Sequence, residues 1–122
     1  TFASLSGVVS VRPLVALGRS ATSGRMPTHD ELAQFLCEFA RLMPEEKTRF
    51  LTAVRKIVED MRAGRGFRPG LRVKSVEGHG DIFEMTWAPD GRATFEYGAE
   101  RQVGEAHIIW RRVGGHDMLA NP

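Results

Sequence analysis

A turn signal, Pro89-Asp90-Gly91, separates two short runs of β-branched and aromatic residues. The runs read IFEMTW at 82–87 and RATFEY at 92–97. Proline presets its own φ and glycine tolerates a positive φ, so this turn is typical of a chain reversal between two strands. The sequence therefore predicts an antiparallel β-hairpin here, and the rest of the chain must pack around it.

Two further runs extend the predicted sheet to about four strands. The first covers Leu71–Val76, and its alternation places Arg72 and Lys74 on one face. The last run, Ala106–Val113, is the most apolar of the four, and we expect it to be a central strand. In the hairpin, Glu84 is a single carboxylate in the middle of an otherwise apolar strand.

Two helical patterns precede these strands. Thr28 and Glu31 have the spacing of a capping box, and apolar residues then recur at intervals of three and four as far as Leu42. A second apolar stripe follows Pro44, which the first turn of a helix tolerates, and ends at Gly64. The link between the helices is short, so we expect an antiparallel helical hairpin. A helical hairpin packed on a twisted antiparallel sheet of about four strands belongs to the α+β class.

The length of 122 residues suits one domain with one core and is too short for two. Residues 1–26 are small, serine-rich and free of acid, and we interpret them as a poorly ordered or accessory segment, or as an upstream extension of the reading frame. The alternative is that Gly7–Leu17 supplies an edge strand. The folded domain is predicted to cover 27–122. The single cysteine, Cys37, excludes an internal disulfide and fits a reducing cytoplasm.

Charged side chains are distributed unevenly along the chain. Three of the 17 basic side chains lie in the first 25 residues, whereas all 15 acidic side chains follow them, so the predicted domain is nearly neutral. Within it, one stretch carries five cations and no acid: Arg62, Arg65, Arg68, Arg72 and Lys74. This pattern indicates a local anion site and not a general coat for nucleic acid.

Several common chemistries are missing from the sequence. It has no glycine-rich phosphate loop, no serine elbow, no dinucleotide fingerprint and no Cys/His metal spacing. The four histidines are scattered, without a second ligand at helical spacing. We therefore expect neither a metal site nor a cofactor.

The order of these motifs resembles the core of the RelE/ParE toxin superfamily. The resemblance rests on LRVK at 71–74, IFEMTW at 82–87, DGRATFEY at 90–97 and HIIWRRVGGHDML at 107–119. The closing arginine, glycine, histidine and aspartate are most similar to the YafQ-like and HigB-like branches. The resemblance implies a cytoplasmic toxin of a type II toxin–antitoxin system that cuts mRNA on the ribosome. It also implies a cognate antitoxin protein as partner.

The resemblance and the residues left unassigned together indicate a site for metal-free RNA cleavage. Attack of a ribose 2′-hydroxyl on the neighbouring phosphate needs a base, a cation facing the phosphate charge, and an acid for the leaving 5′-oxygen. We expect Glu84 to be the base, Arg92 the phosphate contact and His116 the acid. The residues expected to bind flanking RNA or to orient this set are Arg72, Lys74, Arg111 and Asp117.

Structural alternatives exist for each of these roles. Glu84 can form a structural ion pair across the sheet with Arg92 or Arg111, and His116 can be an ordinary chain-end residue. Relatives often carry an aromatic residue just past the histidine, where this chain has Met118 and Leu119. The chain can therefore also be a ParE-like gyrase inhibitor or a catalytically inactive module that binds its antitoxin. A nuclease requires Glu84, Arg92 and His116 on the face opposite the helices, with Arg92 and His116 within roughly 15 Å.

Overall fold

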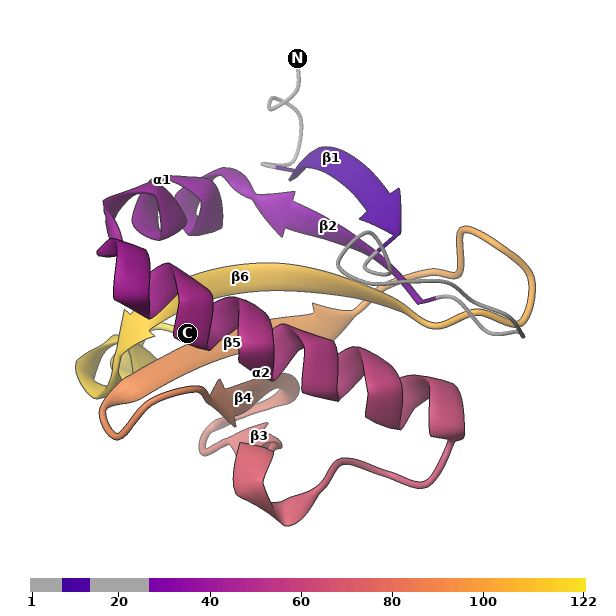
Figure 1. The fold of residues 1–122 in the computed structure, drawn as a ribbon. Coiled ribbons are helices and arrows are strands. Elements are labelled where there is room, and N and C mark those ends of the chain that lie inside the picture. Colours follow the sequence, from indigo (N-terminus) through magenta and orange to yellow (C-terminus); the bar gives the residue numbers. More distant parts are fainter. Residues whose placement is uncertain (1–7, 14–26) are drawn as a thin grey trace.

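The computed structural model describes residues 8–13 and 27–122. Within these ranges the chain forms two layers, with both α-helices on the same face of one sheet (Figure 1). A layer of helices on a sheet agrees with the predicted class. No helix in the described ranges has both the length and the hydrophobicity that a membrane span requires.

The sheet of the described residues is mixed and has six strands, so the prediction of about four antiparallel strands is wrong. The strands are β1 Val8–Pro13, β2 Thr28–Leu32, β3 Lys74–Val76, β4 His79–Thr86, β5 Gly91–Tyr97 and β6 His107–Gly115. They lie in the order β1-β2-β6-β5-β4-β3, and every neighbouring pair is antiparallel except β2 and β6, which run parallel. The predicted hairpin is the β4–β5 pair, and the predicted central strand is β6, which lies inside the sheet.

The first helix begins later than predicted, because Thr28–Leu32 is a strand. Thr28 and Glu31 therefore do not form the predicted capping box, and helix α1 covers Ala33–Arg41. Strand β2 lies between β1 and β6, so its backbone is paired on both sides. Two ladders of hydrogen bonds outweigh a single cap, which contributes about 1 kcal/mol.

The second helix, α2 at Pro44–Ala63, follows the prediction closely. Pro44 is its first residue, Glu45 and Glu46 occupy the first turn, and Gly64 ends it in the left-handed conformation at φ 70°. Because α1 has 9 residues and α2 has 20, much of α2 extends past α1. The prediction of a helical hairpin is therefore met only in part, and α2 alone crosses most of the sheet (Figure 1).

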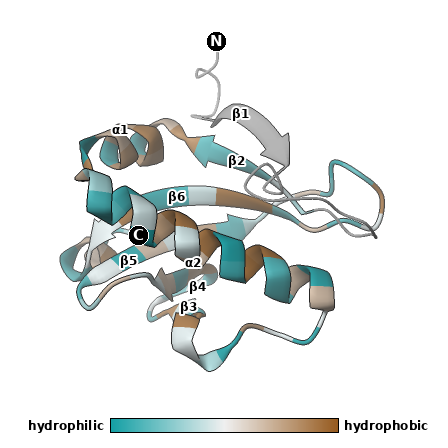
Figure 2. Cartoon of the chain, in the orientation of Figure 1, coloured by the Kyte–Doolittle hydropathy of each residue, from teal (hydrophilic) through white to brown (hydrophobic). Residues whose placement is uncertain are grey.

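The core lies between α2 and the helix-facing side of the sheet. In α2, Phe50, Val54 and Ile57 are buried, and Figure 2 shows polar and apolar residues alternating along this helix. In the sheet, Phe95 and Trp110 are buried with their ring centroids 5.4 Å apart. Burial of each such side chain stabilises the fold by about 1.5–3 kcal/mol. This packing holds α2 against β5 and β6.

Strand β1 forms the outer edge of the sheet and pairs antiparallel with β2. Its residues fall within Gly7–Leu17, where one interpretation of the sequence placed an edge strand. The other interpretation concerned residues 1–26 as a whole, of which 1–7 and 14–26 lie outside the described residues. Part of the N-terminal segment therefore belongs to the sheet.

Candidate functional site

The face of the sheet opposite the helices carries Glu84 and Arg92. Side chains alternate between the two faces of a strand, and Met85 and Phe95 are buried in the helix-side core. Glu84 on β4 and Arg92 on β5 therefore point to the other face. The two strands are neighbours, and Arg92 lies two residues from Thr94, the direct partner of Glu84. Long side chains can reach each other across this diagonal.

Arg92 and Glu84 form an ion pair of low exposure. The Nε atom of Arg92 lies 3.8 Å from Oε1 of Glu84, and their side chains are 17% and 9% exposed. Nη1 of Arg92 also donates to the backbone carbonyls of Ala88, Pro89 and Gly91, at 3.4, 3.3 and 3.0 Å. Arg92 thus holds the β4–β5 turn closed. Within the described residues its Nη2 atom has no such acceptor, so this is the atom left for a ligand.

Lys74 lies beside this pair, but Arg72 does not belong to the same strand. Lys74 on β3 is opposite Glu84 in the ladder, so both side chains share one face, and Lys74 is exposed. Arg72 precedes β3 and adopts a left-handed conformation, φ 51° and ψ 45°, after the 3₁₀-helix η3 at Pro69–Leu71. The prediction that Arg72 and Lys74 share a strand face is wrong, because the chain is still turning at Arg72.

His116 and Asp117 follow β6 directly, at the same end of the sheet as Arg92. Gly114 on β6 pairs with Arg92, and paired Cα atoms in an antiparallel ladder lie about 4.5–5.5 Å apart. Two further residues lead to His116, so the Cα atoms of Arg92 and His116 lie within about 13 Å. Both His116 and Asp117 are exposed, at the start of the 3₁₀-helix η4, His116–Ala120. This spacing lies inside the limit that the nuclease hypothesis sets.

The C-terminal residues cover part of the same face. A Cβ added at Gly114 would lie 3.8 Å from the sulfur of Met118 in η4. Arg111 donates to the carbonyl of Pro122 at 3.4 Å and pairs with Glu96 of β5 at 2.8 Å. The charge of Arg111, which the sequence assigned to RNA binding, is therefore compensated by a carboxylate of the neighbouring strand.

A buried polar chain between β2 and β6 was not predicted. His107 Nδ1 lies 2.7 Å from the Thr28 hydroxyl, and its Nε2 lies 3.0 Å from Asp30 Oδ2, which also accepts from Arg101 at 2.6 Å. Burial lowers the pKa of His107 against the opposing influence of Asp30. Thr28, Asp30 and His107 are buried, and the partly exposed Arg101 links this polar chain to the loop before β6. The spacing of Thr28 and Asp30 on one strand face was the only signal in the sequence.

No family model, no curated protein and no solved structure matches this chain. No group of three or more His, Cys, Asp or Glu residues suited to a metal ion occurs in the described ranges. The chemistry must therefore be inferred from the side chains themselves. The face opposite the helices combines a carboxylate, Glu84, with the cations Lys74 and Arg92, and His116 begins the segment beside them. These are the groups that metal-free phosphodiester cleavage uses.

Proposed function

We propose that this chain is a RelE-like toxin of a type II toxin–antitoxin system, which cleaves mRNA on the ribosome without a metal ion. The observation that supports the proposal best is the strand register. It aligns Lys74, Glu84 and Arg92 on one face and starts the His116 segment next to the partner of Arg92. The order of the sequence motifs resembles that of the RelE/ParE superfamily, and this resemblance is the reason for proposing mRNA as the substrate.

In this proposal Glu84 takes the proton of a ribose 2′-hydroxyl, whose oxygen then attacks the adjacent phosphorus. Arg92 offers Nη2 to the non-bridging oxygens, where negative charge grows. His116, as an imidazolium, gives a proton to the departing 5′-oxygen. The products are a 2′,3′-cyclic phosphate on one fragment and a 5′-hydroxyl on the other. Lys74 contacts a flanking phosphate and Asp117 orients His116.

A second candidate is a binding module without catalytic activity, and the pairing of charges on this face favours it. Glu84 is engaged by Arg92, and Arg111 is engaged by Glu96. A carboxylate with a side-chain exposure of 9% also suits a structural ion pair. In this alternative the face binds an antitoxin segment or DNA gyrase and cuts no RNA.

Inducible expression, followed by mapping of RNA ends and of DNA supercoiling, separates the two candidates. Arg92→Ala should slow cleavage by about a hundredfold or more, because the lost contact faces transition-state charge. His116→Gln keeps a hydrogen-bonding side chain but cannot act as the acid, and should also slow cleavage. Arg41→Ala is the matched control, since Arg41 is an exposed cation at the end of α1.

Arg92 also holds its own turn, so loss of activity in Arg92→Ala counts only if the variant keeps the wild-type melting curve. His116 is exposed, so His116→Gln tests the chemistry even if Arg92→Ala does not fold. Wild-type RNA ends and rates in both variants would refute cleavage at this face. Altered supercoiling without RNA ends would establish the gyrase alternative.

A toxin also needs a partner that silences it in its own cell. The cations on the proposed site make an acidic antitoxin segment the complementary partner. Co-expression with the neighbouring open reading frame should give a stable complex and restore growth. A chain that is harmless at high expression without this partner would count against the toxin proposal.

A further inference from the structure

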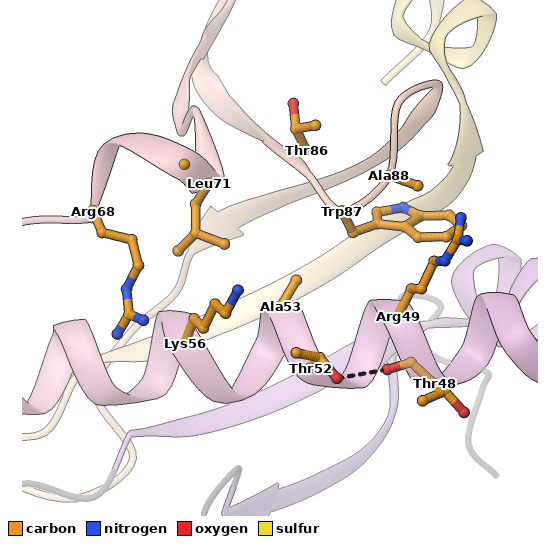
Figure 3. A pocket seen from close by; sticks show the side chains of 11 residues that line it. Thr48, Arg49, Thr52, Ala53, Lys56, Arg68, Leu71, Thr86, Trp87 and Ala88 are labelled. Atoms are coloured by element: carbon orange, nitrogen blue, oxygen red, sulfur yellow. Dashed lines mark hydrogen bonds between the residues drawn. The ribbon is translucent and has the colours of Figure 1, made fainter.

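A groove lies on the helix side of the molecule, between α2 and the end of β4. It consists of two adjoining hollows of about 420 and 360 Å³, which share Arg49, Trp87 and Ala88. Figure 3 shows the larger hollow, with α2 as one wall and the end of β4 together with η3 as the other. Neither Glu84 nor Arg92 lines the groove, although Arg92 hydrogen-bonds from the opposite face to the backbone of the turn that forms one of its walls.

The larger hollow is lined by three cations and by no acid. Arg68 is paired with Glu59 and Asp60, each at 2.9 Å, so its charge is compensated. Arg49 and Lys56 are exposed, and neither enters an ion pair with another described residue. They lie seven residues apart on α2, which is about 10.5 Å along the helix axis. Two separate anionic groups can therefore be bound along this wall.

The indole of Trp87 lies where the two hollows meet. It packs over Gly91, where an added Cβ would lie 2.6 Å from the ring, and it meets the ring of Phe50 edge-on, with centroids 6.1 Å apart. These contacts hold the ring in place, although Trp87 is partly exposed. Its Nε1 atom is buried and has no hydrogen-bond partner among the described residues. In Figure 3 the side chain of Arg49 reaches the same ring.

We propose that this groove is a second binding site, and that its ligand is single-stranded nucleic acid. Arg49 and Lys56 pair with two phosphates, while a base lies against Trp87. A rigid aromatic ring beside two unpaired cations is the combination that binds single strands without reading their sequence. An acidic peptide would use the same cations but would have no need of the ring. The site is independent of the cleavage proposed for the opposite face.

Titration of the full chain into fluorescein-labelled oligo(dT), followed by fluorescence anisotropy, tests the proposal. This probe has no 2′-hydroxyl, so the proposed cleavage cannot consume it, and failure of one proposal leaves the other intact. Arg49→Gln and Lys56→Gln should each weaken binding several-fold and reduce the slope of log K against log salt by about 0.7. Trp87→Leu should weaken binding with an unchanged salt slope, because no phosphate contact is lost.

Two control variants test whether the loss of any exposed cation weakens binding, or only the loss of a cation that lines the groove. Arg55→Gln removes an exposed cation of α2 that does not line the groove, and it should bind like the wild type. Arg41→Gln removes an exposed cation at the end of α1, which lines neither hollow, and should also leave oligo(dT) binding unchanged. The proposal is overturned if the wild type does not bind, or if either control weakens binding as much as Arg49→Gln. A polyglutamate peptide that binds equally well, with no loss in Trp87→Leu, would assign the groove to an acidic peptide.

Discussion

The turn that carries Arg92 contains a steric constraint at Gly91. A Cβ added there would lie 2.6, 2.7 and 2.9 Å from three atoms of the Trp87 indole. Carbon atoms in favourable contact are about 3.5–4.0 Å apart, so the ring or the turn would have to retreat by about 1 Å. We expect Gly91→Ala to lower the free energy of unfolding by about 1–3 kcal/mol, as overpacking of a filled site does.

Gly80→Ala is the matched control for this substitution. Gly80 lies on the neighbouring strand, nothing stands within 4 Å of its added Cβ, and neither glycine has a positive φ. The control should therefore be neutral or should stabilise the fold by about 0.4–1 kcal/mol, since alanine restricts the unfolded chain. In thermal unfolding followed by circular dichroism, Gly91→Ala should lower the midpoint by about 4 °C for each kcal/mol.

The steric penalty arises from one pair of residues, Gly91 and Trp87. In a Trp87→Ala background the ring is gone, so adding Gly91→Ala should no longer destabilise the protein. The double-mutant cycle should give a coupling free energy of about 1–3 kcal/mol. A Gly91→Ala variant as stable as the wild type, or a penalty that persists without the indole, would show that the contact with Trp87 does not limit residue 91.

Two further predictions concern polar groups. Glu38 on α1 accepts the backbone N–H of Val113 at 3.1 Å and pairs with Arg112 at 2.6 Å. Glu38→Ala should lower the free energy of unfolding, measured in urea, by about 1–3 kcal/mol. Arg41→Ala on the same helix is the control and should change it by less than about 0.5 kcal/mol. Equal losses in the two variants would show that the contacts of Glu38 do not stabilise the fold. Burial lowers the pKa of His107 from its ordinary value of 6.5. His107 therefore binds a proton more weakly in the folded protein than in the unfolded chain. Stability should therefore fall as the pH drops below about 6.5, until the folded-state pKa is passed. His107→Gln should flatten this part of the curve of stability against pH, and an unchanged curve would exclude His107 as its cause.

Local signals in the sequence were sufficient for α2 and for the β4–β5 hairpin. Pro44 and Gly64 mark the ends of a helix because of their own backbone preferences, and both stand where predicted. Gly91 was predicted for a different reason from the one that the structure reveals. The turn signal indicated a glycine with a positive φ, but φ of Gly91 is not positive in the structure. Glycine is required at this position because the Trp87 indole packs against its backbone and leaves no space for a Cβ.

The candidate site was predictable only in part. Alternation along β4 accounts for the position of Glu84 on the face opposite Met85, and the turn signal placed Arg92 on the paired strand. The ion pair of Glu84 and Arg92 was one of the alternatives that the sequence offered, whereas the other contacts of the charged residues were not predicted. The pairing of Arg111 with Glu96 joins two strands, so no single run of residues contains it. The closure of the turn by Arg92 is local, since its acceptors lie one to four positions away, but it depends on the conformation of the Arg92 side chain.

By itself, the sequence determined the elements whose signals lie within a few residues of one another, namely helix α2 and the β4–β5 hairpin. Its apolar composition also indicated β6 as an inner strand, although the partners of β6 are distant in the sequence. Only the tertiary structure decided that Thr28–Leu32 is a strand and not the start of a helix. Its partner strand begins at His107, 79 positions beyond Thr28. Backbone hydrogen bonds to so distant a segment, together with those to β1, exceed the small stabilisation that a local cap provides.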